Sequence, residues 1–164
     1  MRRPVTSMLA LATIALAAAS ACSRASEPAA TAKTFTIVEA TIPDMRRAME
    51  NGTVTSRELV VQSLLRIATY EERLNATIAV NPKAIEEAEA LDRERAAGKI
   101  RGPLHGIPIA LKDNIHTTNM PTTGGALAFE GFTPPYEATL TTRLKEAGAI
   151  IIACLLYTSP SPRD

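Results

Sequence analysis

The sequence of 164 residues predicts an α/β fold in which helices cover both faces of a β-sheet. Residues 77–80 form a short strand candidate, and residues 81–97 follow with a helical pattern. The apolar residues Ile107, Ile109 and Leu111 then mark a second strand. A strand, a helix and a strand in succession are the usual building units of such a fold.

The first residues have the pattern of an export signal. An arginine pair precedes an apolar run over residues 8–19, which is too short to span a bilayer comfortably, and small residues lead up to Cys22. We therefore expect residues 1–21 to be a signal peptide. Two processing outcomes fit: cleavage after Ala21 by an ordinary signal peptidase, or attachment of a lipid to Cys22 at a site that resembles a bacterial lipobox.

Lipid attachment is the better explanation of Cys22. It is the only cysteine outside residues 154–164, so an exported chain would offer it no disulfide partner. The protein is accordingly expected to be exported in a bacterium, and to be periplasmic or anchored to the membrane through the lipid on Cys22. Residues 22–34 are rich in alanine and polar side chains and are expected to be a tether.

Two helices are expected at the start of the domain, which begins near Phe35. Pro43 lies early in a periodic segment that an Asn-Gly pair closes at residue 52. Thr55 and Glu58 then form a capping-box pattern at the start of a longer amphipathic segment.

The helix expected over residues 81–97 carries many charges. Asn81 provides a candidate N-cap, and the proline that follows it suits a first turn. The charged side chains predict a solvated face and include candidate i,i+4 ion pairs such as Glu89 with Arg93.

A lysine ends the second predicted strand. Gly102 and Pro103 interrupt whatever precedes them, and the apolar alternation that follows should deliver Lys112 close to the interior. A buried ammonium is costly to desolvate, so a lysine in such a place gives up its proton more readily, as a general base must. Two alternatives stay open: Lys112 could pair with Asp113, or the strand could end at Leu111 with Lys112 in water.

The run GPLHGIPIALKDNI, residues 102–115, resembles the lysine-bearing segment of the amidase signature family, serine hydrolases that cleave carboxamides. The resemblance extends over residues 35–153, with the family's order of two helices, a short strand, a charged helix and the lysine strand. Within the family, the chain resembles secreted bacterial peptide amidases more than the amidotransferase subunits. The resemblance implies the N-terminal part of the amidase signature fold, a mixed β-sheet covered by helices.

In this family a neutral lysine takes a proton from a serine held by a cis peptide bond, and that serine deprotonates the nucleophilic serine. Lys112 matches the family lysine, so the resemblance implies that Lys112 is catalytic in the complete enzyme. Both family serines belong to a Gly/Ser-rich stretch that is not found here. Ser56 and Ser63 fall in an expected helix, and residues 159 and 161 in the tail. We therefore expect an N-terminal fragment that is itself inactive.

The last residues depart from the family pattern at Cys154. Residues 154–164 read CLLYTSPSPRD, without periodicity and with two Ser-Pro pairs that suit a turn. The run resembles translated adapter sequence at the end of genes assembled from short reads. We expect residues 154–164 to be such an artefact.

Charge and motifs limit the partners. The formal net charge is +1, and no basic cluster outside the signal peptide suggests nucleic acid. His105 and His116 lack metal-ligand spacing, so neither a metal nor another cofactor is expected. His105 is expected to support a turn. The loop over residues 122–125 could approach the acyl site or simply turn the chain.

The expected function is hydrolysis of peptide C-terminal amides or small amides by a Ser-cisSer-Lys mechanism in the full-length protein. The expected partners are the amide substrate and, only through the lipid anchor at Cys22, the membrane; no nucleic acid is expected. An exported lipoprotein that retains the scaffold for binding is one alternative. An amidotransferase A-type subunit is less favoured, because an exported protein would not meet charged tRNA.

Overall fold

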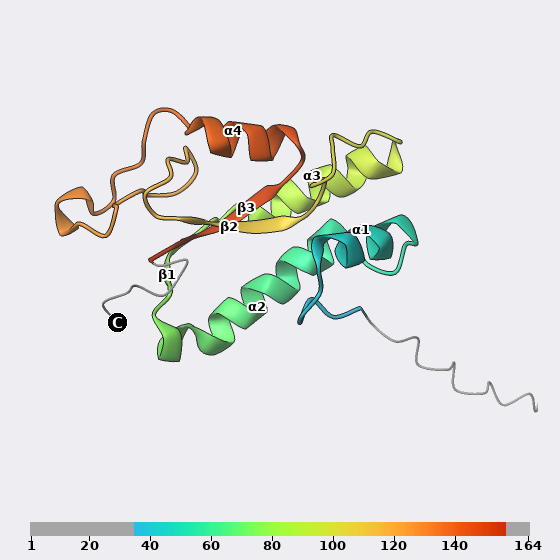
Figure 1. Ribbon diagram of the computed structural model, residues 1–164, viewed down its shortest axis with the longest axis horizontal. Coiled ribbons are helices and arrows are strands. Elements are labelled where there is room, and N and C mark those ends of the chain that lie inside the picture. Colours follow the sequence, from blue (N-terminus) through green and yellow to red (C-terminus); the bar gives the residue numbers. More distant parts are fainter. Residues whose placement is uncertain (1–34, 157–164) are drawn as a thin grey trace, which may run out of the picture. The chain divides into compact units, whose positions relative to one another are not determined.

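A three-stranded mixed sheet forms the centre of the described part of the chain, residues 35–156 of the computed structural model (Figure 1). The strands are β1 (Thr77–Val80), β2 (Pro108–Lys112) and β3 (Ile150–Leu155). Their order is β1-β3-β2, with β2 parallel and β1 antiparallel to the central β3. The predicted α/β class and mixed sheet are thus confirmed. The predictions made for residues 1–34, including Cys22, and for residues 157–164 lie outside the described residues.

The described residues also form four α-helices and a short 3₁₀ helix. They are α1 (Ile42–Glu50), α2 (Ser56–Leu74), α3 (Ala84–Ala96), η1 (Leu127–Phe129) and α4 (Thr139–Glu146). Figure 1 shows α2 and α4 on opposite sides of the sheet. Helices therefore cover both faces, as the alternation of strands and helices predicts.

The starts of α1 and α2 are determined by local hydrogen bonds. The predicted capping box of α2 is present, because the Thr55 hydroxyl accepts from the Glu58 backbone N–H and the Glu58 carboxylate accepts from Thr55. Thr41 and Asp44 form a second capping box at the start of α1. These caps satisfy backbone N–H groups that would otherwise have no partner at each helix start.

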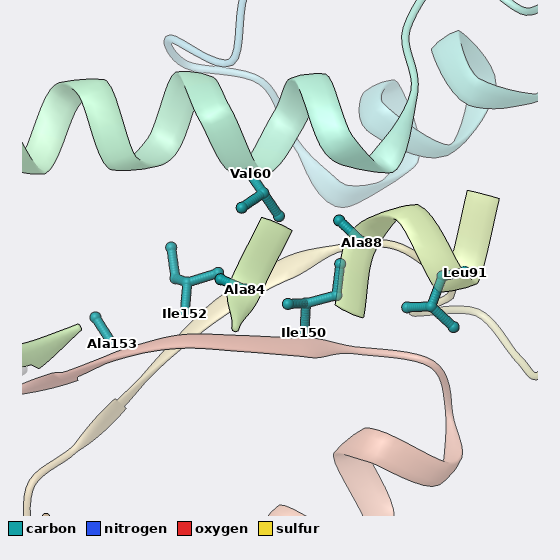
Figure 2. Packing of buried hydrophobic residues seen from close by; sticks show 7 residues of the cluster. All are labelled: Val60, Ala84, Ala88, Leu91, Ile150, Ile152 and Ala153. Atoms are coloured by element: carbon teal, nitrogen blue, oxygen red, sulfur yellow. The ribbon is translucent and has the colours of Figure 1, made fainter. Parts of the chain in front are cut away.

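The apolar cluster between α2, α3 and the sheet is built from small and branched side chains. Its buried members come from the two helices and β3, as Figure 2 shows: Val60, Ala84, Ala88, Leu91, Ile150, Ile152 and Ala153. Alanines on α3 allow the helix to approach the β-branched side chains of β3 closely. A second cluster, with Leu111, Met120, Ile151 and Cys154, lies on the other face, where Leu144 of α4 packs against it.

Helix α3 starts later than predicted. The N-cap is Lys83, without a side-chain cap, so the prediction of Asn81 as the N-cap is wrong. Asn81 is 2% exposed, and its Oδ1 instead accepts from the Lys83 backbone N–H in a turn. The predicted Glu89–Arg93 pair is also replaced, because Glu89 accepts from Arg57 of α2 at 3.0 Å.

Strand β3 bulges at Ile152. Ile109 of β2 is opposite Ile151, but the next residue of β2 is opposite Ala153. As a result, both Ile152 and Ala153 contact the cluster formed with α2 and α3. The strand then continues through Cys154 and Leu155, past the predicted boundary at residue 153. The interpretation of residues 154–164 as an artefact stays a prediction.

The turn before β2 packs tightly against the end of α4. Gly106 donates its N–H to the Gly148 carbonyl over 2.8 Å, and both glycines have positive φ. His105 is 1% exposed; its Nδ1 accepts from the Arg101 N–H, and its Nε2 lies 3.0 Å from the Leu91 carbonyl oxygen. These contacts agree with the turn-supporting role expected for His105.

Candidate active site

Lys112 is the last residue of β2 and is partly buried. Its neighbour Leu111 belongs to the cluster on the α4 side, while Ala110 packs against the cluster with α2 and α3. Because successive side chains of a strand alternate between faces, Lys112 lies on the same face as Ala110. The sequence therefore delivers Lys112 to the end of the strand, as predicted, rather than leaving it beyond the strand.

Lys112 and Asp113 do not form an ion pair. Within residues 35–156, Lys112 makes neither a salt bridge nor a side-chain hydrogen bond. The Asp113 carboxylate is instead bound by backbone and hydroxyl groups of a nearby loop. The alternative in which Lys112 pairs with Asp113 is thus wrong, and the Lys112 amine is left without a carboxylate partner in this part of the chain.

Asp113 anchors the loop over residues 122–125 to the end of β2. It is 2% exposed, and its two carboxylate oxygens accept from the Thr123 N–H at 3.0 and 3.1 Å. They also accept from the Thr123 hydroxyl and from the Gly125 N–H, the latter at 3.3 Å. Hydrogen bonds from several donors compensate the loss of water around a buried carboxylate.

The main chain reinforces this anchor. The Asp113 N–H donates to the Leu155 carbonyl at 2.9 Å, and its carbonyl accepts from Gly124 at 3.0 Å. Gly124 and Gly125 have φ values of 60° and 76°, a conformation that side chains rarely adopt. The loop thus turns the chain back onto the end of the lysine strand, and its approach to an acyl site stays a prediction.

An open pocket of about 210 Å³ lies directly after this strand end. Its lining residues carry no carboxylate, ammonium or guanidinium group, and they are Asn114, His116, Thr122, Thr123, Gly124, Phe129 and Phe132. The Phe129 and Phe132 rings are in tilted contact, with centroids 6.2 Å apart. Lys112 is not among the lining residues, so the pocket and the lysine are neighbouring features rather than one cavity.

The serines of α2 are structural. Ser56 is fully buried, and its Oγ lies 3.5 Å from the Met49 sulfur. The Ser63 hydroxyl donates to the Leu59 carbonyl one turn earlier, at 2.8 Å. Neither hydroxyl has a basic partner, which agrees with their exclusion as nucleophiles on sequence grounds.

Sequence reasoning missed the role of Asp113 and considered it only as a partner of Lys112. The available signal was an acidic residue directly after a buried strand, followed ten residues later by the small residues Thr123, Gly124 and Gly125. Such residues offer backbone N–H groups at close range.

Residues 35–156 contain neither a cluster suited to a metal ion nor a helix suited to a membrane. In this range no group of three or more His, Cys, Asp or Glu side chains is arranged to hold a metal ion. No helix in the same range is both long and apolar enough to cross a membrane.

The fold and site define an α/β protein that presents an unpaired lysine and a carboxylate-anchored glycine loop at one end of a mixed sheet. A sequence profile of the Amidase family matches residues 58–155, which include all three strands and Lys112. The chain therefore belongs to the amidase family.

Curated relatives include the A-type subunit of the glutamyl-tRNA(Gln) amidotransferase of Rhodopirellula baltica, which is 44% identical over 110 residues, 66% of this chain and 22% of the relative. Among solved structures, the native peptide amidase from Stenotrophomonas maltophilia is 43% identical, with a TM-score of 0.69 over 71% of this chain and 24% of that one. An amidase family protein from Bacillus anthracis is 33% identical, with a TM-score of 0.68 over 73% and 24% of the two chains.

These similarities cover a small part of each relative. The chain spans 24% of the peptide amidase and 22% of the amidotransferase subunit. The identities to the two kinds of enzyme are nearly equal, so sequence identity does not choose between them. The activity of a complete protein is accordingly a matter for proposal.

Proposed function

We propose that the full-length protein to which this chain belongs hydrolyses carboxamide C–N bonds, with Lys112 as the base. The observation that carries this proposal is the place of Lys112, at the end of a strand parallel to β3 and without a carboxylate partner in the described residues. Ligands of open α/β sheets bind beyond the carboxyl ends of parallel strands. A lysine that is not paired with a carboxylate is free to exchange its proton with a reacting group.

The proposed chemistry is a proton relay. Lys112, acting as the base, takes a proton from one serine, and that serine deprotonates the nucleophilic serine that attacks the amide carbonyl. The family resemblance supports this relay, and we assign neither serine to a residue of the present chain. We accordingly expect the 164-residue chain alone to release no ammonia from amides.

Peptide C-terminal amides and small amides are the proposed substrates. The similarity to a peptide amidase supports them, and so does the export signal expected in residues 1–21.

The export proposal includes lipid attachment at Cys22. Radiolabelled fatty acid should enter the membrane-associated wild-type protein but not the Cys22→Ser variant, and label in both variants would reject Cys22 as the attachment site.

Ammonia release by the purified full-length protein tests the hydrolase proposal. We expect release from a peptide amide, and loss of this release in Lys112→Ala but not in Lys99→Ala, which removes an exposed lysine. A second candidate function is that of an amidotransferase subunit, because the chain is about as similar to the subunit of Rhodopirellula baltica, at 44% identity, as it is to the peptide amidase, at 43%. Activity only in the presence of charged tRNA and partner subunits would support that candidate instead.

A further inference from the structure

Asp113 is the most heavily hydrogen-bonded carboxylate at the lysine end of the sheet. Three donors bind it: the Thr123 N–H, the Thr123 hydroxyl and the Gly125 N–H. Asp113 takes part in no salt bridge within the described residues, although it is 2% exposed. A buried carboxylate without a cation is retained at a desolvation cost, which these hydrogen bonds offset.

The number of donors explains why this position requires a carboxylate. An asparagine would offer one acceptor oxygen and would turn an NH₂ group toward the remaining donors. Thr123 and Gly125 together present three hydrogens to the same side chain. The two oxygens of a carboxylate therefore accept from all three donors of the loop, whereas the single oxygen of an amide would leave some of these donors without an acceptor.

This anchor acts on the backbone of Lys112. The Asp113 N–H continues the β2–β3 ladder to the Leu155 carbonyl, and the Lys112 carbonyl accepts from the Ile115 N–H at 3.0 Å. The Lys112 side chain has no ion pair within residues 35–156 that would hold it in place. The position of its amine thus depends on the strand end that Asp113 and the loop stabilise.

We propose that Asp113 is a positioning residue, whose carboxylate holds the loop over residues 122–125 against the end of β2 and so fixes Lys112 for proton transfer. This inference rests on the proposed amidase function. A displacement of a reacting group by ~1 Å lowers the rate of the chemical step by up to about 100-fold. Substrate binding, which does not use Asp113 directly, should change little.

The test is amide hydrolysis by the full-length protein carrying Asp113→Asn. We expect kcat per folded molecule to fall about 10- to 100-fold, with KM within about twofold of wild type. Hydrogen exchange should also become faster at the Thr123 and Gly125 amides. Asp92→Asn is the matched control, because Asp92 accepts from the Ser56 and Arg57 backbone N–H groups, away from Lys112. It should lower stability without lowering kcat per folded molecule.

Unchanged kcat per folded molecule in Asp113→Asn, with only a lower unfolding temperature, would overturn the inference. If Asp113→Asn does not fold, Thr123→Val removes the hydroxyl alone and should lower kcat about threefold at constant KM; unchanged kcat would then overturn it. Wild-type protein without any amide hydrolysis would reject the proposed function itself. An active wild type beside an equally active Asp113→Asn would reject only the positioning role.

Discussion

The side-chain amide of Asn81 donates to the carbonyl oxygen of Ile151 over 2.9 Å, beside the bulge of β3. The Asn81 backbone N–H donates to the next carbonyl, that of Ile152, over the same distance. A bulge interrupts the regular ladder and leaves a backbone group in need of another partner. Asn81 supplies this partner from the turn between β1 and α3.

Asn81→Ala should lower the free energy of unfolding by about 1–3 kcal/mol, because the Ile151 carbonyl would be left buried without its donor. Asn81→Asp should be at least as destabilising, since it keeps the acceptor for Lys83 but directs a negative charge at the carbonyl. Urea denaturation measures both effects. The control is Asn51→Ala, an exposed position expected within about 0.5 kcal/mol of wild type. Equal stabilities for the Asn81 and Asn51 variants would contradict this role.

Gly148→Ala should be more destabilising than Gly98→Ala. Both glycines have positive φ, 92° and 75°, but a Cβ on Gly148 would lie 2.5 Å from the His105 Cα, whereas one on Gly98 would meet nothing within 4 Å. The strained conformation alone costs about 1–2 kcal/mol, the expected effect at Gly98. Forced overpacking at Gly148 should add about 1–3 kcal/mol. Similar denaturation midpoints for the two variants would show that the turn around His105 can move aside.

Cys154 should react slowly with iodoacetamide in the folded protein. Burial, with a smaller contribution from the Asp113 charge, raises the pKa of the Cys154 thiol from 9.0 to about 11. Since the thiolate is the reacting form, the folded chain should be labelled far more slowly than the urea-unfolded chain at about pH 8. A Cys22→Ser background leaves Cys154 as the only thiol. Equal labelling rates with and without urea would contradict the burial of Cys154.

The same shift predicts a loss of stability in alkali. The unfolded chain loses the Cys154 proton near 9.0 and the folded chain near 11, so the folded state binds more protons between these values. The contribution of Cys154 to stability is therefore complete below about pH 9 and is lost as the pH rises toward 11. In urea denaturation over this pH range, the free energy of unfolding should decline more steeply for the 164-residue chain with Cys154 than for its Cys154→Ala variant. Parallel declines would contradict the raised pKa of Cys154.

Local signals in the sequence predicted the elements well. The strand at Thr77–Val80 has its predicted bounds, and the capping box at Thr55 starts α2 as expected. The position of Lys112 at the end of its strand could be predicted from an apolar alternation and two helix breakers. Both signals come from residues close to Lys112 in the sequence. Such features depend on a few successive side chains, which a single sequence displays completely.

Contacts between distant segments could not be predicted in this way. Glu89 pairs with Arg57 rather than Arg93, Asn81 binds β3 rather than capping α3, and Asp113 binds a loop ten residues away. In each case the local partner was plausible, but packing of distant segments brought a different hydrogen-bonding partner within reach. The bulge at Ile152 belongs to the same class, because the register shift between β2 and β3 depends on the residues of both strands.

Lys112→Ala should lower kcat of the full-length protein by about two to four orders of magnitude, the usual contribution of a general base, while the fold stays intact. Lys112→Arg should not restore activity, because a guanidinium keeps its proton at any working pH and cannot accept one from serine. Ammonia release and thermal unfolding, measured on both variants and on Lys99→Ala, separate chemistry from stability. A structural lysine predicts the opposite pattern, in which arginine is tolerated and alanine harms stability more than turnover. Near-normal turnover by Lys112→Arg would reject Lys112 as the base, and with it the proton relay proposed for this protein.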